Sequence, residues 1–187
     1  LYKGALFMIA GVIDHETGTR DVTRLGGLVK SMPLLAGITA LAGISFAGFG
    51  PLISFIGKEL IFEALLHAPI FQIGLLIITI LTSAVFVSLA LIVFFKPFLG
   101  QKKGIAIHDT HGHGVSASLW LGPAILAILG LILGLAPQLV ARYIAQPAVS
   151  AVINESIQLK LSLWHGFNPA LGLSLLAVAL GVILYGV

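Results

Sequence analysis

Long apolar runs without a single formal charge most constrain what this chain can fold into. Four such runs cover residues 31–57, 71–95, 119–141 and 168–187. The hydrocarbon core of a bilayer is about 30 Å thick, so a helix needs about 20 apolar residues to cross it. Because the bilayer offers no water to the backbone, a crossing helix forms its hydrogen bonds internally. The runs therefore predict an all-α, polytopic bundle of transmembrane helices.

The composition supports the same reading. Hydrophobic residues make up 58% of the chain and charged residues 9%, with a mean hydropathy of +1.11. Soluble proteins carry about 25% charged residues, so we interpret the chain as an integral membrane protein. It has no cysteine, which excludes disulfides and thiolate metal sites. The net charge of +3 fits lysines and arginines that flank membrane helices better than a nucleic-acid partner.

Polar segments divide the chain into three parts. We expect membrane helices over residues 1–95, a polar, histidine-containing loop over 96–118, and further transmembrane helices over 119–187. About six membrane helices are predicted, the first one truncated, because Leu1 lies inside an apparent helix without a signal peptide. The chain is therefore expected to be an internal fragment of a longer protein. Residues 149–163 are predicted to form an amphipathic helix in the membrane interface.

A break is predicted in one of the membrane helices. We expect a helix over residues 33–49, a sharp turn at Gly50 and Pro51, and a second helix over 52–67 that is interrupted near Gly57. Glycine and proline are tolerated in transmembrane helices because neighbouring helices satisfy the freed backbone groups. The sequence thus predicts one discontinuous membrane helix.

Two lysines lie deep in these predicted helices. Lys58 is about ten residues, or ~15 Å, from the end of its helix near Ala68, and Lys3 lies at a similar distance from the polar loop that begins at Asp14. Charges at this depth commonly mark ion pathways, and transporters place ion sites beside helix breaks. We interpret both lysines as proton carriers. The alternatives are a structural ion pair for Lys58 and an interfacial anchor for Lys3.

Three further titratable residues follow Lys58 at helical spacing. Glu59, Glu63 and His67 are four residues apart, so they are expected to share one face of the helix. Such a ladder, running from the middle of the membrane toward its surface, is suited to proton transfer. The alternative for Glu63 and His67 is an ordinary solvated position among the headgroups, where polar side chains are readily accommodated.

The polar loop contains a histidine group with a spacing that a metal ion uses in other proteins. His108, His111 and His113 are its members. A glycine-rich loop without an obvious fourth ligand is more often simply polar. We therefore expect no metal site and no cofactor, and keep the three histidines as weak candidates.

Three motifs resemble the antiporter-like subunits that complex I shares with the multi-subunit Mrp sodium/proton antiporters. They are LYKGALF at residues 1–7, RLGGL at 24–28 and FIGKE at 55–59. Three others look like the large A-type subunit of the Mrp antiporters in particular. These are DHETGTRD at residues 14–21, KELIFEA at 58–64 and WHGFNP at 164–169. The resemblance covers essentially the whole chain.

The resemblance implies a fold and a role for the two lysines. Such subunits consist of inverted repeats with broken helices, in which buried lysines and glutamates exchange protons along a hydrophilic axis. Lys3 would match the lysine in the middle of this axis, and Lys58 the lysine of the terminal half-channel. Residues 1–95 would form the end of the proton-translocating domain. The implied partners are other membrane subunits, the lipid bilayer of the plasma membrane, protons and sodium.

We therefore expect a subunit of a secondary cation/proton antiporter, which is a transporter rather than an enzyme. One alternative is a proton-pumping membrane subunit of a complex I-like NADH or ferredoxin quinone oxidoreductase. Another is a scaffold subunit without transport, in which the buried lysines are dispensable. The sequence reveals no cluster of uncharged oxygen ligands that marks a sodium site.

Overall fold

The computed structural model describes residues 1–101, 115–164 and 166–187. The histidine group of His108, His111 and His113 lies outside these ranges. Within them, every regular element is a helix. The elements in chain order are α1 (Tyr2–Thr17), η1 (Leu28–Lys30), α2 (Pro33–Phe46), α3 (Ile53–Leu66), α4 (Gln72–Phe94), η2 (Phe95–Leu99), α5 (Ala117–Leu135), α6 (Pro137–Val140), η3 (Ala141–Ala145), α7 (Gln146–Ile153) and α8 (Pro169–Gly186).

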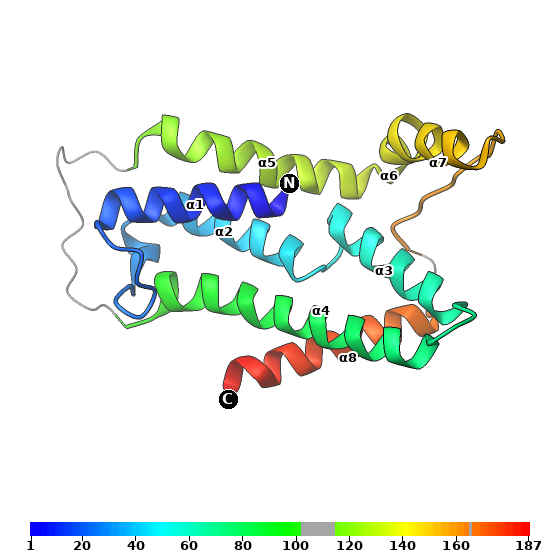
Figure 1. The fold of residues 1–187 in the computed structure, drawn as a ribbon. Helices are drawn as coiled ribbons and strands as arrows, with labels where there is room; N and C mark the ends of the chain where they lie inside the picture. Colours follow the sequence, from blue (N-terminus) through cyan, green and yellow to red (C-terminus); the bar gives the residue numbers. More distant parts are fainter. Residues whose placement is uncertain (102–114, 165) are drawn as a thin grey trace.

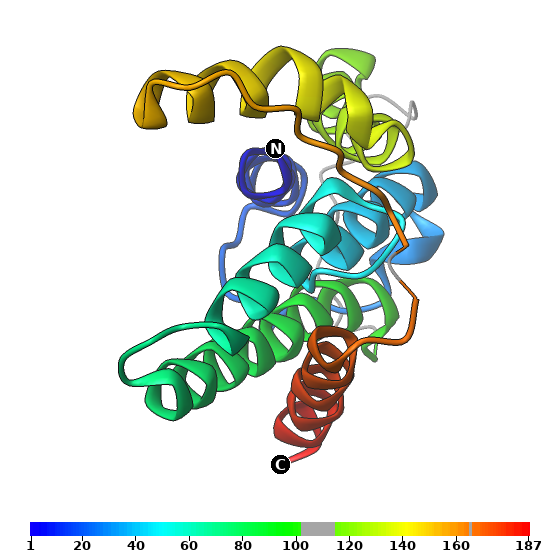
Figure 2. The ribbon, with the colours of Figure 1, turned by 90° about the vertical axis from the view of Figure 1, so that its right-hand side faces the viewer.

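The helices form an elongated bundle (Figure 1). Helices α5 to α7 lie along one edge and α8 lies at the opposite edge, with the remaining helices between them (Figure 2). Among the described residues, three helical segments are long and apolar enough to cross a membrane: Gln72–Leu99, Ala117–Leu135 and Pro169–Gly186. The chain is thus a membrane protein with an all-helical fold, as the apolar runs predict.

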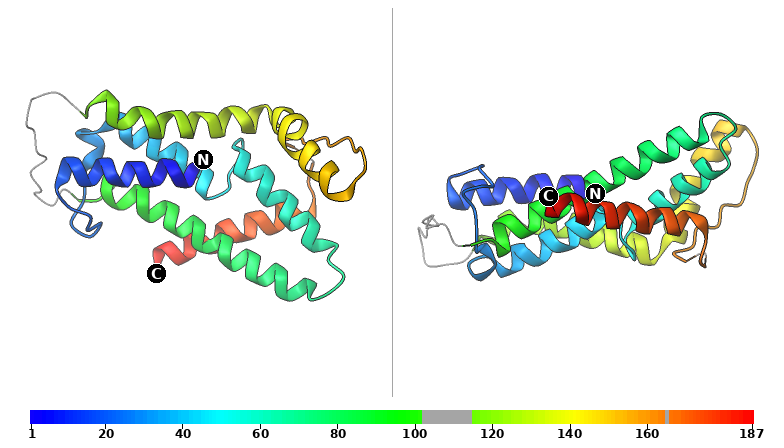
Figure 3. Two further views of the ribbon diagram at one scale, coloured as in Figure 1. Left: turned by 45° about the horizontal axis from the view of Figure 1, so that its top comes forward. Right: turned by 90° about the horizontal axis from the view of Figure 1, so that it is seen from below.

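Helices α2 and α3 follow one another, joined by a link over residues 47–52 at the predicted turn of Gly50 and Pro51, and the discontinuous helix predicted over residues 52–67 is the unbroken α3. Each has 14 residues, which corresponds to about 21 Å and is too short for a hydrocarbon layer of about 30 Å. In Figures 1 and 3, α3 continues in the general direction in which α2 runs. Both halves pack against α4 and against α5. The two short helices therefore act as one interrupted rod between two long ones.

Two boundaries differ from the sequence prediction. The expected interruption at Gly57 is wrong, since α3 is continuous from Ile53 to Leu66. A glycine costs a helix only about 1 kcal/mol, and the packing of α3 against α5 and α8 outweighs that cost. The expected helix over 149–163 is also wrong in extent, because α7 ends at Ile153. The next residue, Asn154, has a left-handed conformation with φ of 56°, which is a common helix terminator.

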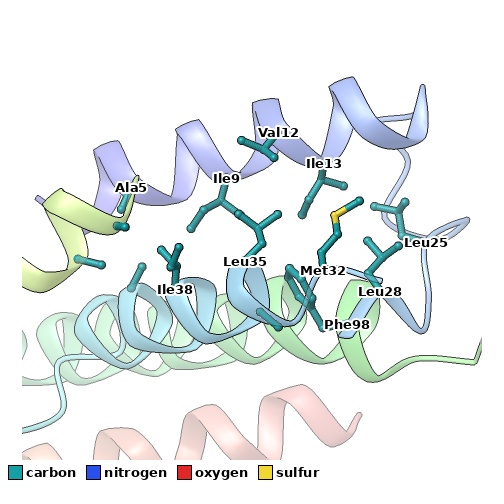
Figure 4. Packing of buried hydrophobic residues seen from close by; sticks show 14 residues of the cluster. Ala5, Ile9, Val12, Ile13, Leu25, Leu28, Met32, Leu35, Ile38 and Phe98 are labelled. Atoms are coloured by element: carbon teal, nitrogen blue, oxygen red, sulfur yellow. The ribbon is translucent and has the colours of Figure 1, made fainter. Parts of the chain in front are cut away.

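A cluster of buried hydrophobic residues joins α1, α2 and α5. In Figure 4, Ile9 and Ile13 of α1 point toward Leu35 of α2 and toward Met32, the residue just before α2, and Phe98 of η2 completes the cluster. These apolar contacts hold α1 alongside α2, the first half of the interrupted rod. They consequently set the position of the start of α1 next to the end of α2.

Small residues let α8 approach α4 closely. A Cβ atom at Gly181 of α8 would lie 2.5 Å from Cβ of Val87 and 2.6 Å from the carbonyl oxygen of Ala84, both in α4. Ala177 and Ser174, which precede Gly181 on α8, are also buried. Small residues at such positions are typical of membrane helix pairs, where close backbone approach maximises van der Waals contact.

We expect Gly181→Ala to weaken this helix pair. The added methyl group meets a backbone oxygen, which cannot move aside as a flexible side chain does, so the loss in stability should be about 1–3 kcal/mol. Gly172→Ala on the same helix is the control, because a Cβ there meets no described atom within 4 Å. The measurement is the melting temperature of the purified, assembled complex. Equal melting temperatures for the two variants would contradict the close packing of α8 on α4.

Candidate functional site

The break between α2 and α3 creates polar backbone groups within the apolar bundle. The chain leaves α2 through Ala47 and Gly48 and passes Gly50 and Pro51 before α3 begins at Ile53. The last carbonyl groups of a helix have no partner within the helix and carry a partial negative charge. The end of α2 is therefore a place where a cation is stabilised.

The ammonium group of Lys58 occupies this place. Its Nζ donates a hydrogen bond to the carbonyl oxygen of Ala47 at 3.4 Å. A second contact ties the two halves of the rod together, because the hydroxyl groups of Ser45 and Ser54 are 3.0 Å apart and share a hydrogen bond. Lys58 thus reaches back from α3 across the break and caps the end of α2.

Gly48 makes room for this arrangement. A Cβ atom at this position would lie 3.0 to 3.1 Å from Cδ, Cε and Nζ of Lys58, and the backbone of Gly48 has φ of +71°. This left-handed conformation is one that glycine adopts without steric cost. Both the backbone turn and the close passage of the lysine side chain therefore require glycine here.

Lys58 lines a cavity of about 460 Å³ between α1, α2, α3 and α4. Its walls combine aromatic rings with hydroxyl groups, a set that sequence reasoning did not identify. The aromatic lining residues are Tyr2, Phe46 and Phe86, and the hydroxyl-bearing ones besides Tyr2 are Ser54, Thr79, Thr82 and Ser83.

The hydroxyl-bearing residues of α4 could have been found from their spacing in the sequence. Thr79, Thr82 and Ser83 have spacings of three and four residues, which place them on one face of an otherwise apolar helix. The hydroxyl of Thr79 donates to the carbonyl oxygen of Leu75 at 2.8 Å, so its oxygen remains able to accept a hydrogen bond or a cation. Their spacing indicates a polar stripe, while only the fold shows that the stripe meets Lys58.

Lys3 approaches the same cavity from α1. Its Nζ lies 6.0 Å from the centre of the Phe86 ring, a distance at which a cation is attracted to the face of an aromatic ring. The Phe86 ring stacks on Phe46 with centres 5.0 Å apart, and Phe46 lies 5.7 Å from Tyr2. The fold therefore places Lys3 beside Phe86, which lines the Lys58 cavity, while Lys3 itself is exposed and is not one of the lining residues.

The predicted ladder of Glu59, Glu63 and His67 is divided by the fold. Glu59 is buried, with 8% of its surface exposed, and its charge acts electrostatically on Lys58. Glu63 and His67 are exposed, and Nδ1 of His67 lies 3.0 Å from the backbone oxygen of Glu63. None of the three carboxylate or imidazole side chains is among the residues that line the Lys58 cavity.

The part of the chain that the structure describes contains no group of three or more histidine, cysteine, aspartate or glutamate residues that could hold a metal ion. The weak candidates His108, His111 and His113 lie outside that part.

Comparisons with known proteins place these features in a family. Residues 1–92 match the family model described as NADH:quinone oxidoreductase/Mrp antiporter, TM. Over 98% of its length the chain is 36% identical to the A-type subunit of the Na(+)/H(+) antiporter of Alkalihalophilus pseudofirmus and to its A1-type counterpart in Staphylococcus haemolyticus. The chain belongs to the NADH:quinone oxidoreductase/Mrp antiporter family. It spans 24% of the length of each of these two relatives.

A solved structure of the same family has the same fold. The chain superimposes on the Mrp complex from Dietzia sp. DQ12-45-1b with a TM-score of 0.73 and 35% sequence identity. The match covers 99% of this chain and 20% of the chain in that complex. The interrupted rod and its long neighbours are therefore part of an antiporter-family membrane fold.

Proposed function

We propose that this chain is part of a subunit of a multi-subunit cation/proton antiporter, and that Lys58 carries a proton on its transport path. The observation that carries the proposal is the ammonium group of Lys58, held against the Ala47 carbonyl at a helix break, in a largely apolar cavity whose wall also contains hydroxyl-bearing residues. The printed names of the relatives, Na(+)/H(+) antiporter subunits, support sodium as the ion exchanged for protons.

The proposed mechanism is electrostatic switching. A protonated Lys58 is attracted to the negative end of α2, whereas a neutral amine loses that attraction. Arrival or loss of a nearby charge then changes the protonation of Lys58, because charges interact strongly in a low dielectric. Glu59 acts on Lys58 from the neighbouring position, and Lys3 approaches the same cavity through Phe86.

The proposal also covers the other residues of the proton path, the division of the chain, its partners and its location. Lys3, Glu59, Glu63 and His67 are proposed to extend the proton path on either side of Lys58. We assign residues 1–95 to the end of the proton-translocating domain, 96–118 to a connecting loop and 119–187 to further transmembrane helices. Other membrane subunits are the proposed partners, and the plasma membrane is the proposed location.

Sodium/proton exchange in everted vesicles that contain the whole complex tests the role of Lys58. We expect Lys58→Ala to lower the exchange rate at least about tenfold, because a change of about 1.4 kcal/mol in the barrier suffices for that factor. Lys160→Ala is the matched control, since Lys160 is exposed and lies far along the chain after α7.

The assay is driven by a sodium gradient without NADH, so a purely redox-driven pump gives no signal. Complex assembly is compared by the amounts of partner subunits that co-purify with each variant. A normal exchange rate for an assembled Lys58→Ala complex would refute the proposal and favour a scaffold role for this part of the subunit.

A further inference from the structure

We infer that Ser45 and Ser54 are positioning residues for Lys58, because the hydrogen bond between their hydroxyl groups fixes the start of α3 relative to the end of α2. This alignment sets whether the Lys58 ammonium group reaches the carbonyl oxygen of Ala47. The inference rests on the proposed function, since it concerns the group that is proposed to carry the proton. It adds two residues on which proton transport depends and which do not themselves carry a proton.

The two serines lie on opposite sides of the break. Ser45 is in the last turn of α2 and two residues before Ala47, the acceptor of the Lys58 hydrogen bond. Ser54 is in the first turn of α3 and four residues before Lys58, so these two side chains lie on the same face of the helix. Ser54 and Lys58 also line the same cavity. The serine pair and the lysine contact therefore cross one break, about one helical turn apart.

The hydrogen bond of the serine pair joins two helices, whereas hydroxyl groups in helices often bond within their own helix. The hydroxyl of Thr39 in α2 is of the second kind, because it donates to the carbonyl oxygen of Leu35 at 2.7 Å. The oxygen atoms of Ser45 and Ser54 are 3.0 Å apart, and among the described residues each hydroxyl has only the other as its hydrogen-bond partner. Serine hydroxyls that bond in this way hold membrane helices together.

Packing around the break leaves the alignment of α2 and α3 to such directional contacts. Each of these helices packs more extensively on α4 and α5 than on the other. Ser45 is buried beside α5, where a Cβ atom at Gly130 would lie 4.0 Å from its Oγ. Apolar contacts are non-directional, whereas a hydrogen bond requires a particular distance and angle. The serine pair therefore supplies a directional contact across the break.

The Lys58 hydrogen bond is sensitive to this alignment. Its length of 3.4 Å between Nζ and the Ala47 oxygen is already near the upper limit for a hydrogen bond. A small displacement of α3 thus separates the ammonium group from its acceptor. The loss of one hydrogen bond changes the balance between the aligned and displaced arrangements by about fivefold.

Sodium/proton exchange by the whole complex in everted vesicles tests the inference, with each rate divided by the amount of assembled complex. We expect Ser45→Ala and Ser54→Ala each to lower the rate about fivefold. The double variant should exchange no more slowly than the slower single variant, because the first substitution already removes the shared hydrogen bond. Ser54→Thr keeps the hydroxyl group and should restore most of the rate.

Thr39→Ala is the matched control, because Thr39 is a fully buried residue of α2 whose hydrogen bond stays within the helix. Thr39→Ala and Ser45→Ala each remove one buried hydroxyl group, so both should lower the melting temperature of the complex. Only Ser45→Ala should lower the exchange rate. This difference separates positioning of Lys58 from a general loss of stability.

The inference is overturned if Ser45→Ala and Ser54→Ala exchange as fast as Thr39→Ala, or if their effects multiply in the double variant. If Ser45→Ala does not assemble, the half-buried Ser54 decides, and equal rates for Ser54→Ala and Ser54→Thr overturn the inference. The proposed function fails by a different result, namely normal exchange by Lys58→Ala. Lost exchange by Lys58→Ala together with normal exchange by both serine variants would refute the positioning role alone.

Discussion

Replacing Gly134 with alanine should sharply reduce the amount of assembled complex. Gly134 is near the end of α5, where a Cβ atom would lie 2.2 Å from the carbonyl oxygen of Pro51, 2.6 Å from the carbonyl carbon of Leu52 and 2.7 Å from the backbone nitrogen of Ile53. All three are backbone atoms, two in the link between α2 and α3 and one in the first residue of α3, so no side-chain rotation relieves the contact.

The expected loss in stability is about 3 kcal/mol or more, at the upper end of the range for overpacked cores. To avoid the clash, α5 has to move away from the break, and it then loses its packing against both halves of the interrupted rod. The measurement is the fraction of complex that remains intact in detergent after a temperature ramp, followed by size-exclusion chromatography.

Gly130→Ala is the control for this prediction. It lies one turn earlier on α5, and among the described atoms a Cβ there meets only the Ser45 hydroxyl, at 4.0 Å, which is an ordinary contact. Similar amounts of intact complex for the Gly130 and Gly134 variants would show that α5 does not rest on the break.

The second large effect is expected at Gly48. With Gly48→Ala, exchange should fall at least about tenfold although Lys58 is still present. The new Cβ takes the space 3.0 to 3.1 Å from the end of the lysine side chain, so the ammonium group is pushed away from the Ala47 carbonyl. The end of the lysine side chain must move by a few tenths of an ångström, and such a shift breaks a hydrogen bond that is already 3.4 Å long.

The control separates this displacement from backbone strain. Gly18 ends α1 with a similar left-handed φ of +66°, and a Cβ there meets no described atom within 4 Å. Gly18→Ala therefore introduces strain of roughly 1 kcal/mol without moving a charged side chain. Exchange should fall in the Gly48 variant and remain near the original rate in the Gly18 variant. If both variants exchange equally, the contact between Gly48 and Lys58 has no functional role.

Helix positions follow closely from the sequence where apolar runs are long. The run over residues 71–95 corresponds to α4, Gln72–Phe94, and the run over 168–187 corresponds to α8, Pro169–Gly186. Hydrophobic length is a local property, because each residue contributes to membrane insertion largely by its own transfer free energy. The division of the rod near Gly50 and Pro51 is also visible in the sequence, because it too depends on the local residues.

Local rules failed where tertiary packing decides the outcome. Gly57 suggests an interruption, yet the contacts of α3 with α5 and α8 keep the helix continuous. Glu59 and Glu63 share one face of α3, but spacing alone does not indicate that Glu59 is buried and Glu63 exposed; their role in proton transfer stays a prediction. Helical spacing predicts which residues lie on one face of a helix, but it does not predict which neighbouring helix packs against that face.

The sequence by itself determined that this chain is an all-helical membrane protein with a turn at Gly50 and Pro51 and a lysine, Lys58, in the helix that follows the turn. Only the tertiary structure decided what surrounds that lysine. The hydroxyl groups of Thr79, Thr82 and Ser83 reach the cavity of Lys58 because α4 packs against α2 and α3. The physical reason is that hydrophobic length and backbone breaks are encoded residue by residue, whereas a cavity is formed by side chains from several helices.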